Sequence, residues 1–327
     1  MKIIDEILTR EEFIENPPVL LDIGSSGHLV GNWKDIAKYS ICIAFDADKR
    51  DIEYIVEENK KYKKLYLYNC IVTDKENGKR DFFLTKSPYC SSSLKPDSKS
   101  LRNYAFFDLF TIENKVNLKA MNLKTVLGNL KIRRVDWLKT DSQGTDLRLF
   151  NSLDNPLKKS VLVADFEPGI IDAYISEDKL ADLLLNMDKL PFWVSSMKIA
   201  SSHRLNSDIL SKKINKFEIN ALTQCSKLVP HCAEITYMNS FNDKGRFSKR
   251  DYLLMWIFSI INKQYNFAIE VAIKGSEKFE DSIFTKLIND TLALTKTELR
   301  KRKSLNLPNL YKYIKNRIGI NFGNLSK

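Results

Sequence analysis

The sequence contains few of the residues that build disulfide-rich, fibrous or metal-binding proteins. Its 327 residues include 5 cysteines, 11 glycines and 9 prolines, and no two cysteines form a Cys-x-x-Cys pair. This odd, unpaired set excludes a disulfide framework and a zinc knuckle as first interpretations. Cys225, His231 and Cys232 lie close in the sequence, but they lack a fourth ligand, so we predict that they pack and assign no metal.

Long apolar runs are also missing. No uninterrupted run approaches the roughly 20 residues of a membrane span, and charges interrupt any signal-peptide window in residues 1–10. The sequence therefore predicts a cytoplasmic protein with reduced thiols. Its 43% of apolar residues suffices for a sizeable core, and the length favours one large domain with a smaller one appended.

The positive charge is concentrated at the C-terminal end. The net charge is +11, and residues 245–327 contain 16 Lys/Arg against 7 Asp/Glu, which places nine of the eleven net charges there. Such a segment suits an anionic membrane surface, an acidic glycan or a nucleic acid, because each presents closely spaced negative charge. Peripheral contact with the inner membrane face and a merely solvated helical face remain alternatives.

Strand-like and helix-like segments alternate along most of the chain. Strands are predicted at 19–23, 41–45, 65–72, 80–84, 135–140, 161–166, 192–199 and 233–238, and helices at 32–40, 49–61, 123–130, 147–153 and 177–188. The alternation predicts an α/β, Rossmann-like fold: a doubly wound, mostly parallel sheet with an antiparallel late strand. We expect 65–72 and 80–84 to form a hairpin.

Two segments interrupt this pattern. Residues 87–117 are expected to form an insertion over the sheet. We predict that Ser91, Ser92 and Ser93 face solvent, with hydrogen bonds to a polar acceptor as the alternative. The aromatic residues of 104–110 are predicted to pack in the core, with a stacking platform as the alternative. The polar stretch 239–246 is the predicted linker between a domain at 1–240 and a basic helical extension at 248–327, with helices at 252–274 and 283–303.

A loop rich in small residues follows the first predicted strand. Leu21-Asp-Ile-Gly-Ser-Ser-Gly27 would let a ligand approach backbone N–H groups, so Asp22, Gly24, Ser25 and Gly27 are candidate cofactor-binding residues. The Gly-x-x-Gly spacing is a poor match to Gly-x-Gly-x-x-Gly, and a dinucleotide cofactor is less favoured for that reason.

Polar residues also follow the next two strands. Asp46 ends the second strand, where a carboxylate can accept hydrogen bonds from both hydroxyls of a ribose, with Asp48 as the fallback. The alternative is that either aspartate only caps the next helix. Asn69 follows the third strand and is a candidate for the edge that an adenine would cover.

These features resemble the FkbM-type methyltransferase family. The resemblance rests on Val19-Leu-Leu-Asp-Ile-Gly-Ser-Ser-Gly27, Ala44-Phe-Asp-Ala-Asp48, Tyr89-Cys-Ser-Ser-Ser-Leu-Lys-Pro96 and above all Val135-Asp-Trp-Leu-Lys-Thr-Asp-Ser-Gln-Gly-Thr-Asp-Leu147. It covers about residues 18–200. It implies a class I methyltransferase fold, S-adenosyl-L-methionine as methyl donor, and transfer to a hydroxyl of a sugar or natural product. Asp46 stands where the family commonly has Glu, and His28 where a small residue is common.

Methyl transfer to a hydroxyl requires positioning and a group that accepts the proton. Candidates are Asp141 and Glu167, which follow predicted strands, and His203, in a loop after a late strand. Asp141 is also a candidate cofactor ligand. Glu167 precedes Pro168 and could equally make a structural hydrogen bond, and His203 could be an ordinary surface histidine.

Three functions follow from this sequence. The first is O-methylation of a saccharide or related polar acceptor, in surface-glycan biosynthesis. The second is RNA methylation, suggested by the basic tail but unsupported by any Asn-Pro-Pro-Tyr type motif or RNA-binding module. The third is a non-catalytic scaffold that binds the cofactor and uses its helical tail to bind another protein.

Overall fold

The chain divides into two units, Met1–Phe247 and Ser248–Lys327. The computed structural model describes residues 2–25, 30–48, 50, 61–242 and 246–318, with side chains up to residue 301. The division falls at the predicted start of the basic extension and seven residues after the predicted end of the first domain.

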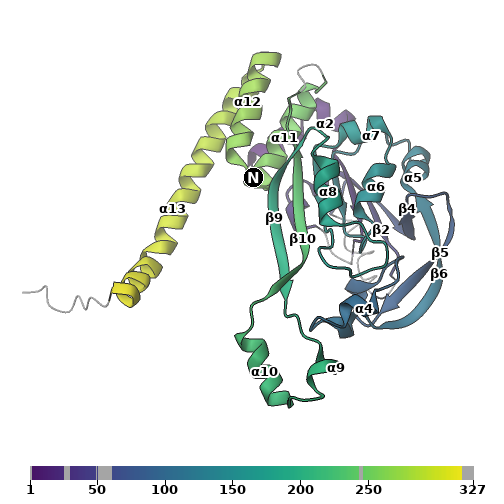
Figure 1. Ribbon diagram of the computed structural model, residues 1–327. Coiled ribbons are helices and arrows are strands. Elements are labelled where there is room, and N and C mark those ends of the chain that lie inside the picture. Colours follow the sequence, from purple (N-terminus) through teal and green to yellow (C-terminus); the bar gives the residue numbers. More distant parts are fainter. Residues whose placement is uncertain (1, 26–29, 49, 51–60, 243–245, 319–327) are drawn as a thin grey trace, which may run out of the picture. The chain divides into compact units, whose positions relative to one another are not determined.

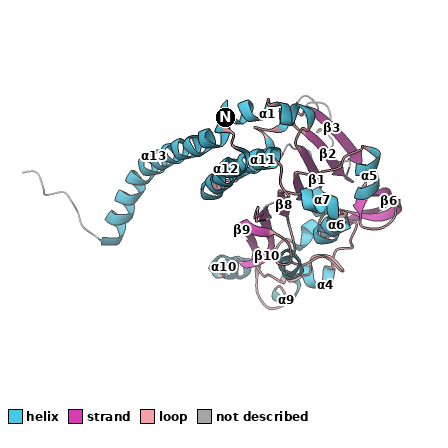
Figure 2. Cartoon of the chain, turned by 90° about the horizontal axis from the view of Figure 1, so that it is seen from above, coloured by secondary structure: helices cyan, strands magenta, loops and turns pink. Residues whose placement is uncertain are grey.

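The first unit is built on a seven-stranded sheet in the order β3-β2-β1-β7-β8-β10-β9 (Figures 1 and 2). The strands are β1 (Val19–Ile23), β2 (Ile41–Asp46), β3 (Lys64–Asn69), β7 (Trp137–Thr140), β8 (Val163–Phe166), β9 (Phe192–Ser202) and β10 (Val229–Asn239). β10 runs antiparallel to both of its neighbours, β8 and β9, and is the only strand of this sheet with the reversed direction. The predicted Rossmann-like fold of the class I methyltransferase type, with one antiparallel late strand, is confirmed.

The strand order reverses at β1. The chain leaves β1 to build β2 and β3 on one side, and later returns to place β7 and β8 on the other side. Parallel pairing brings Asp22 level with Lys139 across β1 and β7, and Asp46 level with Asn69 across β2 and β3. Because the crossovers diverge at this point, a crevice forms beyond the carboxyl ends of β1 and β7.

Alternate residues of the central strands bury opposite faces of the sheet. Leu21, Ile23 and Leu138 face a core shared with α5 (Leu123–Asn129), α6 (Asp146–Ser152), α7 (Asn155–Ser160) and α8 (Leu180–Met187). On the other face, Trp137 packs edge-on against Trp33 with ring centroids 6.0 Å apart. Figure 2 shows α1 (Lys2–Leu8), which precedes α2 (Glu11–Glu15), on the opposite side of the strands from α6 and α7.

A second sheet of three short strands has the order β4-β6-β5. Its strands are β4 (Ile71–Thr73), β5 (Gly78–Thr85) and β6 (Ile112–Asn122). The predicted hairpin of 65–72 with 80–84 is wrong, because β6 lies between β4 and β5 and pairs with both. The physical reason is the buried Ala120 on β6, on which Ile71 and Phe82 from the two outer strands converge.

Two other local predictions need correction or lie outside the described residues. The segment predicted as a helix at 32–40 forms two 3-10 turns, η1 (Gly31–Trp33) and η2 (Ala37–Tyr39). The helix predicted at 49–61 falls almost wholly on residues that the structure does not describe. In the 87–117 segment lie η5 (Pro88–Cys90), α4 (Ser98–Leu101), η6 (Phe107–Phe110) and the first half of β6.

The last two strands extend beyond the sheet as an arm. β9 and β10 are each 11 residues long, and they carry α9 (Ser207–Leu210) and α10 (Lys216–Cys225) at their far end (Figure 1). The arm begins beside β8, so the first residues of β10 lie close to the end of that strand: Gly169 forms an isolated bridge with Cys232.

The second unit consists of α11 (Lys249–Ile261), α12 (Tyr265–Phe279) and α13 (Ser282–Ile318). The single helix predicted at 252–274 is wrong. Asn262 caps the Phe258 carbonyl through its side chain at 2.9 Å, and Lys263 has a positive φ of 58°, so the chain turns here. The indole of Trp256 donates to Thr291 at 3.0 Å and joins α11 to α13.

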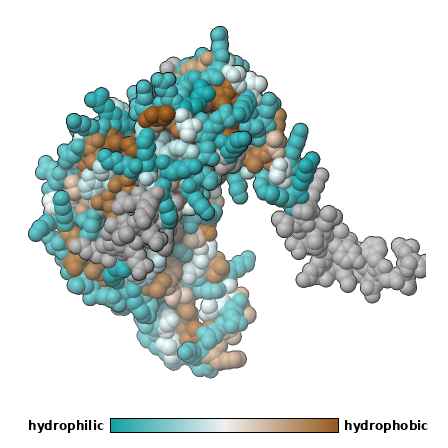
Figure 3. All heavy atoms as spheres, turned by 180° about the vertical axis from the view of Figure 1, so that it is seen from behind, coloured by the Kyte–Doolittle hydropathy of each residue, from teal (hydrophilic) through white to brown (hydrophobic). Residues whose placement is uncertain are grey.

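None of the described helices combines the length and the apolarity that crossing a bilayer requires. On the face in Figure 3, hydrophilic side chains predominate and apolar ones form separate patches.

Candidate active site

A cavity of about 210 Å³ opens at the carboxyl ends of β1, β2, β7 and β8, at the point where the strand order reverses. Ligands in open α/β sheets bind at this position. Polar residues line it on both sides of β1, and an apolar wall comes from the second sheet: the described lining includes Gly24, Asp46, Asp48, Ile71, Val72, Phe82, Tyr89, Ser91, Ser93, Asp141, Gln143 and Glu167.

Gly24 is required by the protein's own backbone. Its φ is +79°, and a Cβ placed on it would lie 2.0 Å from the carbonyl oxygen of Asp141. The N–H groups of Gly24 and Ser25 both donate to the Phe45 carbonyl, at 2.9 and 3.1 Å. The loop is therefore fixed to β2 and β7, and these two N–H groups already have partners. Ser25 lies outside the cavity lining, whereas Gly27 falls outside the described residues.

Asp22 lies beneath the cavity and is fully buried. The Lys139 ammonium donates to Asp22 Oδ1 and to the Gly24 carbonyl, both at 3.3 Å, and lies 4.0 Å from Asp141 Oδ2. Burial raises the pKa of Asp22, against the opposing effect of Lys139. Burial lowers the pKa of Lys139, but the charges of Asp22 and Asp141 outweigh it and the net shift is upward. Asp22 thus anchors the lysine that joins the ends of β1 and β7.

Asp46 ends β2 and lines the cavity. Its Oδ1 accepts a hydrogen bond from the N–H of Asp48 at 2.8 Å, which orients the carboxylate. Asn69 does not line the cavity. Its side-chain amide donates to the Asp46 carbonyl at 2.9 Å, so it supports Asp46, while Cys70 and Ile71 reach the cavity from this side.

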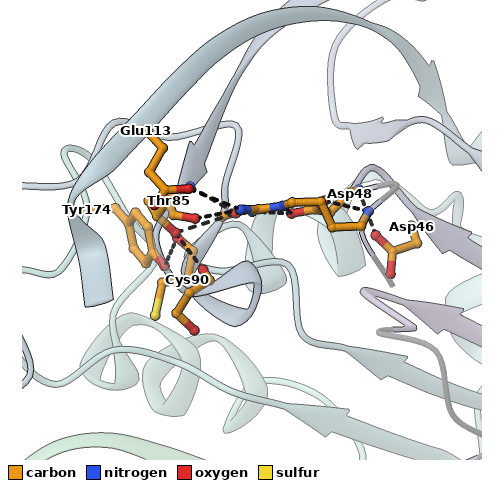
Figure 4. Close-up of polar contacts among 9 residues, drawn as sticks. Asp46, Asp48, Thr85, Cys90, Glu113 and Tyr174 are labelled. Carbon is orange, nitrogen blue, oxygen red and sulfur yellow. Dashed lines mark hydrogen bonds and ion pairs between the residues drawn. The ribbon is translucent and has the colours of Figure 1, made fainter. Parts of the chain in front are cut away.

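Asp48 is engaged with Arg50 (Figure 4). The guanidinium donates to Asp48 at 2.6 Å and continues to the Thr85 carbonyl and the Ser91 hydroxyl, both at 2.8 Å. Burial raises the pKa of Asp48, but its hydrogen bonds to Arg50 outweigh this and the net shift is downward. Arg50 therefore joins the end of β2 to the segment that carries Ser91, and the fallback ribose ligand has another partner.

The serine run is buried, contrary to the prediction that it faces solvent. Ser92 is 1% exposed and donates to the Gln143 carbonyl at 2.7 Å, and Ser91 is 7% exposed. Ser93 is partly buried and lines the cavity. The Ser91 hydroxyl accepts hydrogen bonds from Arg50 and from the Thr85 N–H, and the Ser92 hydroxyl accepts one from the Leu94 N–H, so these two serines satisfy guanidinium and backbone groups beside the cavity.

Asp141 and Glu167 bring two carboxyl groups together where β7 and β8 end. Asp141 continues β7, with its N–H donating to the Ile23 carbonyl at 2.9 Å, and Glu167 follows β8 directly. Burial, then the charge and hydrogen bonding of Asp141, raise the pKa of Glu167 to about 8. At neutral pH the pair therefore holds one proton and one negative charge.

Three neighbouring side chains fix this pair. Gln143 donates to Asp141 Oδ1 at 2.7 Å, and its amide oxygen accepts from the Tyr174 hydroxyl at 2.9 Å. Asp146 is buried and accepts from the Glu167 N–H at 2.8 Å and from the Ser142 N–H at 2.9 Å. The sequence prediction missed Gln143 and Tyr174, because no motif marks a residue whose role is to orient an amide or a carboxylate.

His203 is not brought to the other candidates. It follows β9 in the arm, where its carbonyl accepts from the Ala105 N–H at 3.1 Å, and it lines neither described cavity. Cys225 is exposed on α10, apart from His231 and Cys232 on β10. Within the described part of the chain, no group of three His, Cys, Asp or Glu residues is placed to hold a metal ion.

Comparisons with known proteins leave the family open. No family model and no curated protein matches the chain. A crystal structure of a putative RNA methyltransferase from Pyrococcus horikoshii aligns over 73% of this chain and 83% of its own, with 10% sequence identity and a TM-score of 0.28. At these values the likeness carries no argument about function, which therefore depends on the site itself.

Proposed function

We propose that the protein is an S-adenosyl-L-methionine-dependent methyltransferase that acts on a hydroxyl group. One observation carries the proposal: Asp46 at the end of β2 and Asp141 at the end of β7 line the same cavity, on either side of the strand where the sheet order reverses. The sequence resemblance to FkbM-type methyltransferases supports the choice of cofactor.

The lining suits the separate parts of this cofactor. The Asp46 carboxylate can accept hydrogen bonds from a ribose diol, and Ile71, Val72 and Phe82 offer an apolar wall for a base. Asp141 offers a carboxylate to an ammonium group. When bound, the cofactor would supply a methyl group on a positively charged sulfonium. Arg50 pairs with Asp48, and Lys139 pairs with Asp22 beneath the lining, so the carboxylate of Asp46 and the negative charge of the Asp141–Glu167 pair favour a cation in the cavity.

The paired carboxyl groups suit an oxygen acceptor. A hydroxyl that becomes methylated must lose a proton, and Asp141 and Glu167 together hold one negative charge that can accept it. Gln143 holds Asp141 in place through the hydrogen bond at 2.7 Å. We assign the acceptor to the saccharide class, as the family resemblance implies, and the proton acceptor to this pair.

Calorimetric titration tests the cofactor assignment. S-adenosylmethionine and NAD are titrated into wild-type protein, Asp46→Ala and Asp81→Ala. Asp81 is a matched control because it is exposed on β5, where it pairs with Lys115. We expect selective S-adenosylmethionine binding that Asp46→Ala weakens about 10- to 100-fold, the range for hydrogen bonds to a charged group. NAD binding, or no binding of either cofactor, refutes the proposal.

A further inference from the structure

A second cavity, of about 60 Å³, lies on the far side of Glu167. Glu167 and Gln143 line both this cavity and the larger one. The remaining walls of the small cavity come from the start of β10, from the segment after β8, and from the insertion before β6: His231, Cys232, Gly169, Ile171, Ala173, Tyr174, Glu177, Gly144 and Phe106. The same carboxyl group therefore faces two separate spaces.

Aromatic rings gather beside this small cavity. Phe106 stacks on Tyr104 at 5.5 Å between ring centroids and lies 4.9 Å from the His231 ring and 5.7 Å from Phe110. Phe110 in turn contacts Tyr174 at 5.6 Å. The prediction that residues 104–110 pack in the core is wrong, because their aromatic side chains are only half-buried. An aromatic platform thus lies where the cavity meets the surface.

The charges at this cavity disfavour an anionic ligand. Its described lining contains Glu167 and Glu177 and no lysine or arginine. Glu177 is already satisfied by the Lys179 ammonium at 2.6 Å and by the Ala173 N–H at 2.7 Å. Burial lowers the pKa of His231, so its imidazole is neutral at pH 7 and can exchange hydrogen bonds with hydroxyl groups. The Lys179 ammonium beside the cavity is already paired with Glu177 and Asp172, so it offers little to a phosphate or a carboxylate.

We propose that this second cavity and its aromatic platform form the acceptor subsite, which binds a neutral hydroxylated ring, a saccharide unit, with one face on Phe106 and His231 and one hydroxyl directed at Glu167. The inference rests on the proposed function and adds the place at which the acceptor binds and the side chains that contact it. Apolar C–H faces of a sugar ring suit aromatic surfaces, and the hydroxyl rim suits Glu167 and the His231 imidazole.

Saturation-transfer NMR tests the subsite without requiring turnover. Full-length protein saturated with S-adenosylhomocysteine is mixed with methyl α-D-glucopyranoside, methyl α-D-mannopyranoside, methyl α-L-rhamnopyranoside or adenosine. The variants are Phe106→Leu, which keeps apolar volume but removes the aromatic face, and His231→Ala. Phe217→Leu on α10 is the matched control, since Phe217 is an aromatic residue that is 82% exposed on the same arm.

We expect saturation transfer to at least one glycoside, with affinity about two- to tenfold lower in Phe106→Leu, the range for one aromatic contact, and unchanged in Phe217→Leu. Glycoside binding that both subsite variants leave unchanged overturns the location. Binding of adenosine alone, or of no probe, overturns the saccharide class. Failure of the wild-type protein to bind S-adenosylmethionine in the separate calorimetric test would instead refute the proposed function, so the two failures are distinguishable.

Discussion

Glu167→Gln removes a cavity-lining carboxyl group whose pKa is raised to about 8. In the ligand-free protein Glu167 has a pKa of about 8, raised by burial, by Asp141 and, more weakly, by Asp146 and Glu234. A sulfonium in the adjoining cavity would favour the ionised carboxylate, so binding should release a proton from Glu167 at neutral pH. S-adenosylhomocysteine lacks that positive charge and should release less. Glutamine cannot release a proton at all.

The size of the effect follows from linkage. If the bound cofactor returns the pKa of Glu167 from about 8 to near its ordinary value, the affinity for the charged cofactor rises roughly 10- to 50-fold between pH 6 and pH 8. The amino group of the cofactor also titrates in this range. Both cofactor forms carry it, and the ratio of their two affinities therefore isolates the sulfonium.

The assay is titration calorimetry of both cofactor forms at pH 6, 7 and 8, in buffers of different ionisation enthalpy. The affinity ratio should rise with pH in the wild type and stay flat in Glu167→Gln. Glu270→Gln is the control, because Glu270 on α12 is exposed, is paired with Lys274 at 2.6 Å and is not among the groups that shift the pKa of Glu167. A wild-type ratio that does not change with pH would show that Glu167 does not face the sulfonium.

Three further predictions concern stability, each measured by urea unfolding. Gly24→Ala should lower the free energy of unfolding by about 2–4 kcal/mol, because the positive φ strains an alanine and its Cβ would clash with the Asp141 carbonyl. Gly31→Ala is the control and should change it little, because a Cβ there meets nothing within 4 Å. Lys139→Met should lower the free energy of unfolding by about 3–5 kcal/mol at pH 7, because it leaves the buried carboxylate of Asp22 unpaired. The loss should become smaller as falling pH protonates Asp22. An equal loss at all pH values would contradict this explanation. Because the pKa of Glu167 is raised from 4.5 to about 8, the free energy of unfolding of the wild type should fall as pH rises through this window, by up to about 5 kcal/mol at about 1.36 kcal/mol per pKa unit, and Glu167→Gln should remove this slope.

The fold was predictable because local patterns and tertiary structure agree in the large sheet. Buried strands such as 19–23 and 41–46 are short apolar runs with turn residues after them, and parallel pairing follows from their alternation with helices. The secondary-structure predictions were wrong where contacts between residues far apart in the sequence determine the strand pairing. Nothing near 71–85 indicates that residues 112–122 will insert between two apparent hairpin strands. Likewise, one positive φ at Lys263 divides an apolar pattern that is periodic on both sides.

The site was predictable only in its strand-end residues. Asp46, Asp141 and Glu167 each follow a strand, and parallel strands end at one edge, so sequence position alone places them together. Gln143 and His231 reach the site from a loop and from a late strand, through contacts that no local pattern encodes. His203 shows the converse limit, since it also follows a strand, β9, but lines neither described cavity.

The two cavities and the basic C-terminal unit differ in charge, so we expect them to bind different partners. The described lining of both cavities contains carboxylates but no lysine or arginine, so an anionic polymer gains nothing by entering them. Residues 245–327 carry a net charge of +9, which suits such a polymer or an anionic lipid surface.

We propose that this basic C-terminal segment, residues 245–327, recruits the protein to an anionic surface while a neutral part of the acceptor enters the site. Removal of residues 302–327 should then reduce retention on phosphatidylserine vesicles in a salt-dependent way and leave S-adenosylmethionine affinity unchanged. If the truncation reduced vesicle retention and S-adenosylmethionine affinity equally, the proposal that residues 302–327 act in recruitment alone would be wrong.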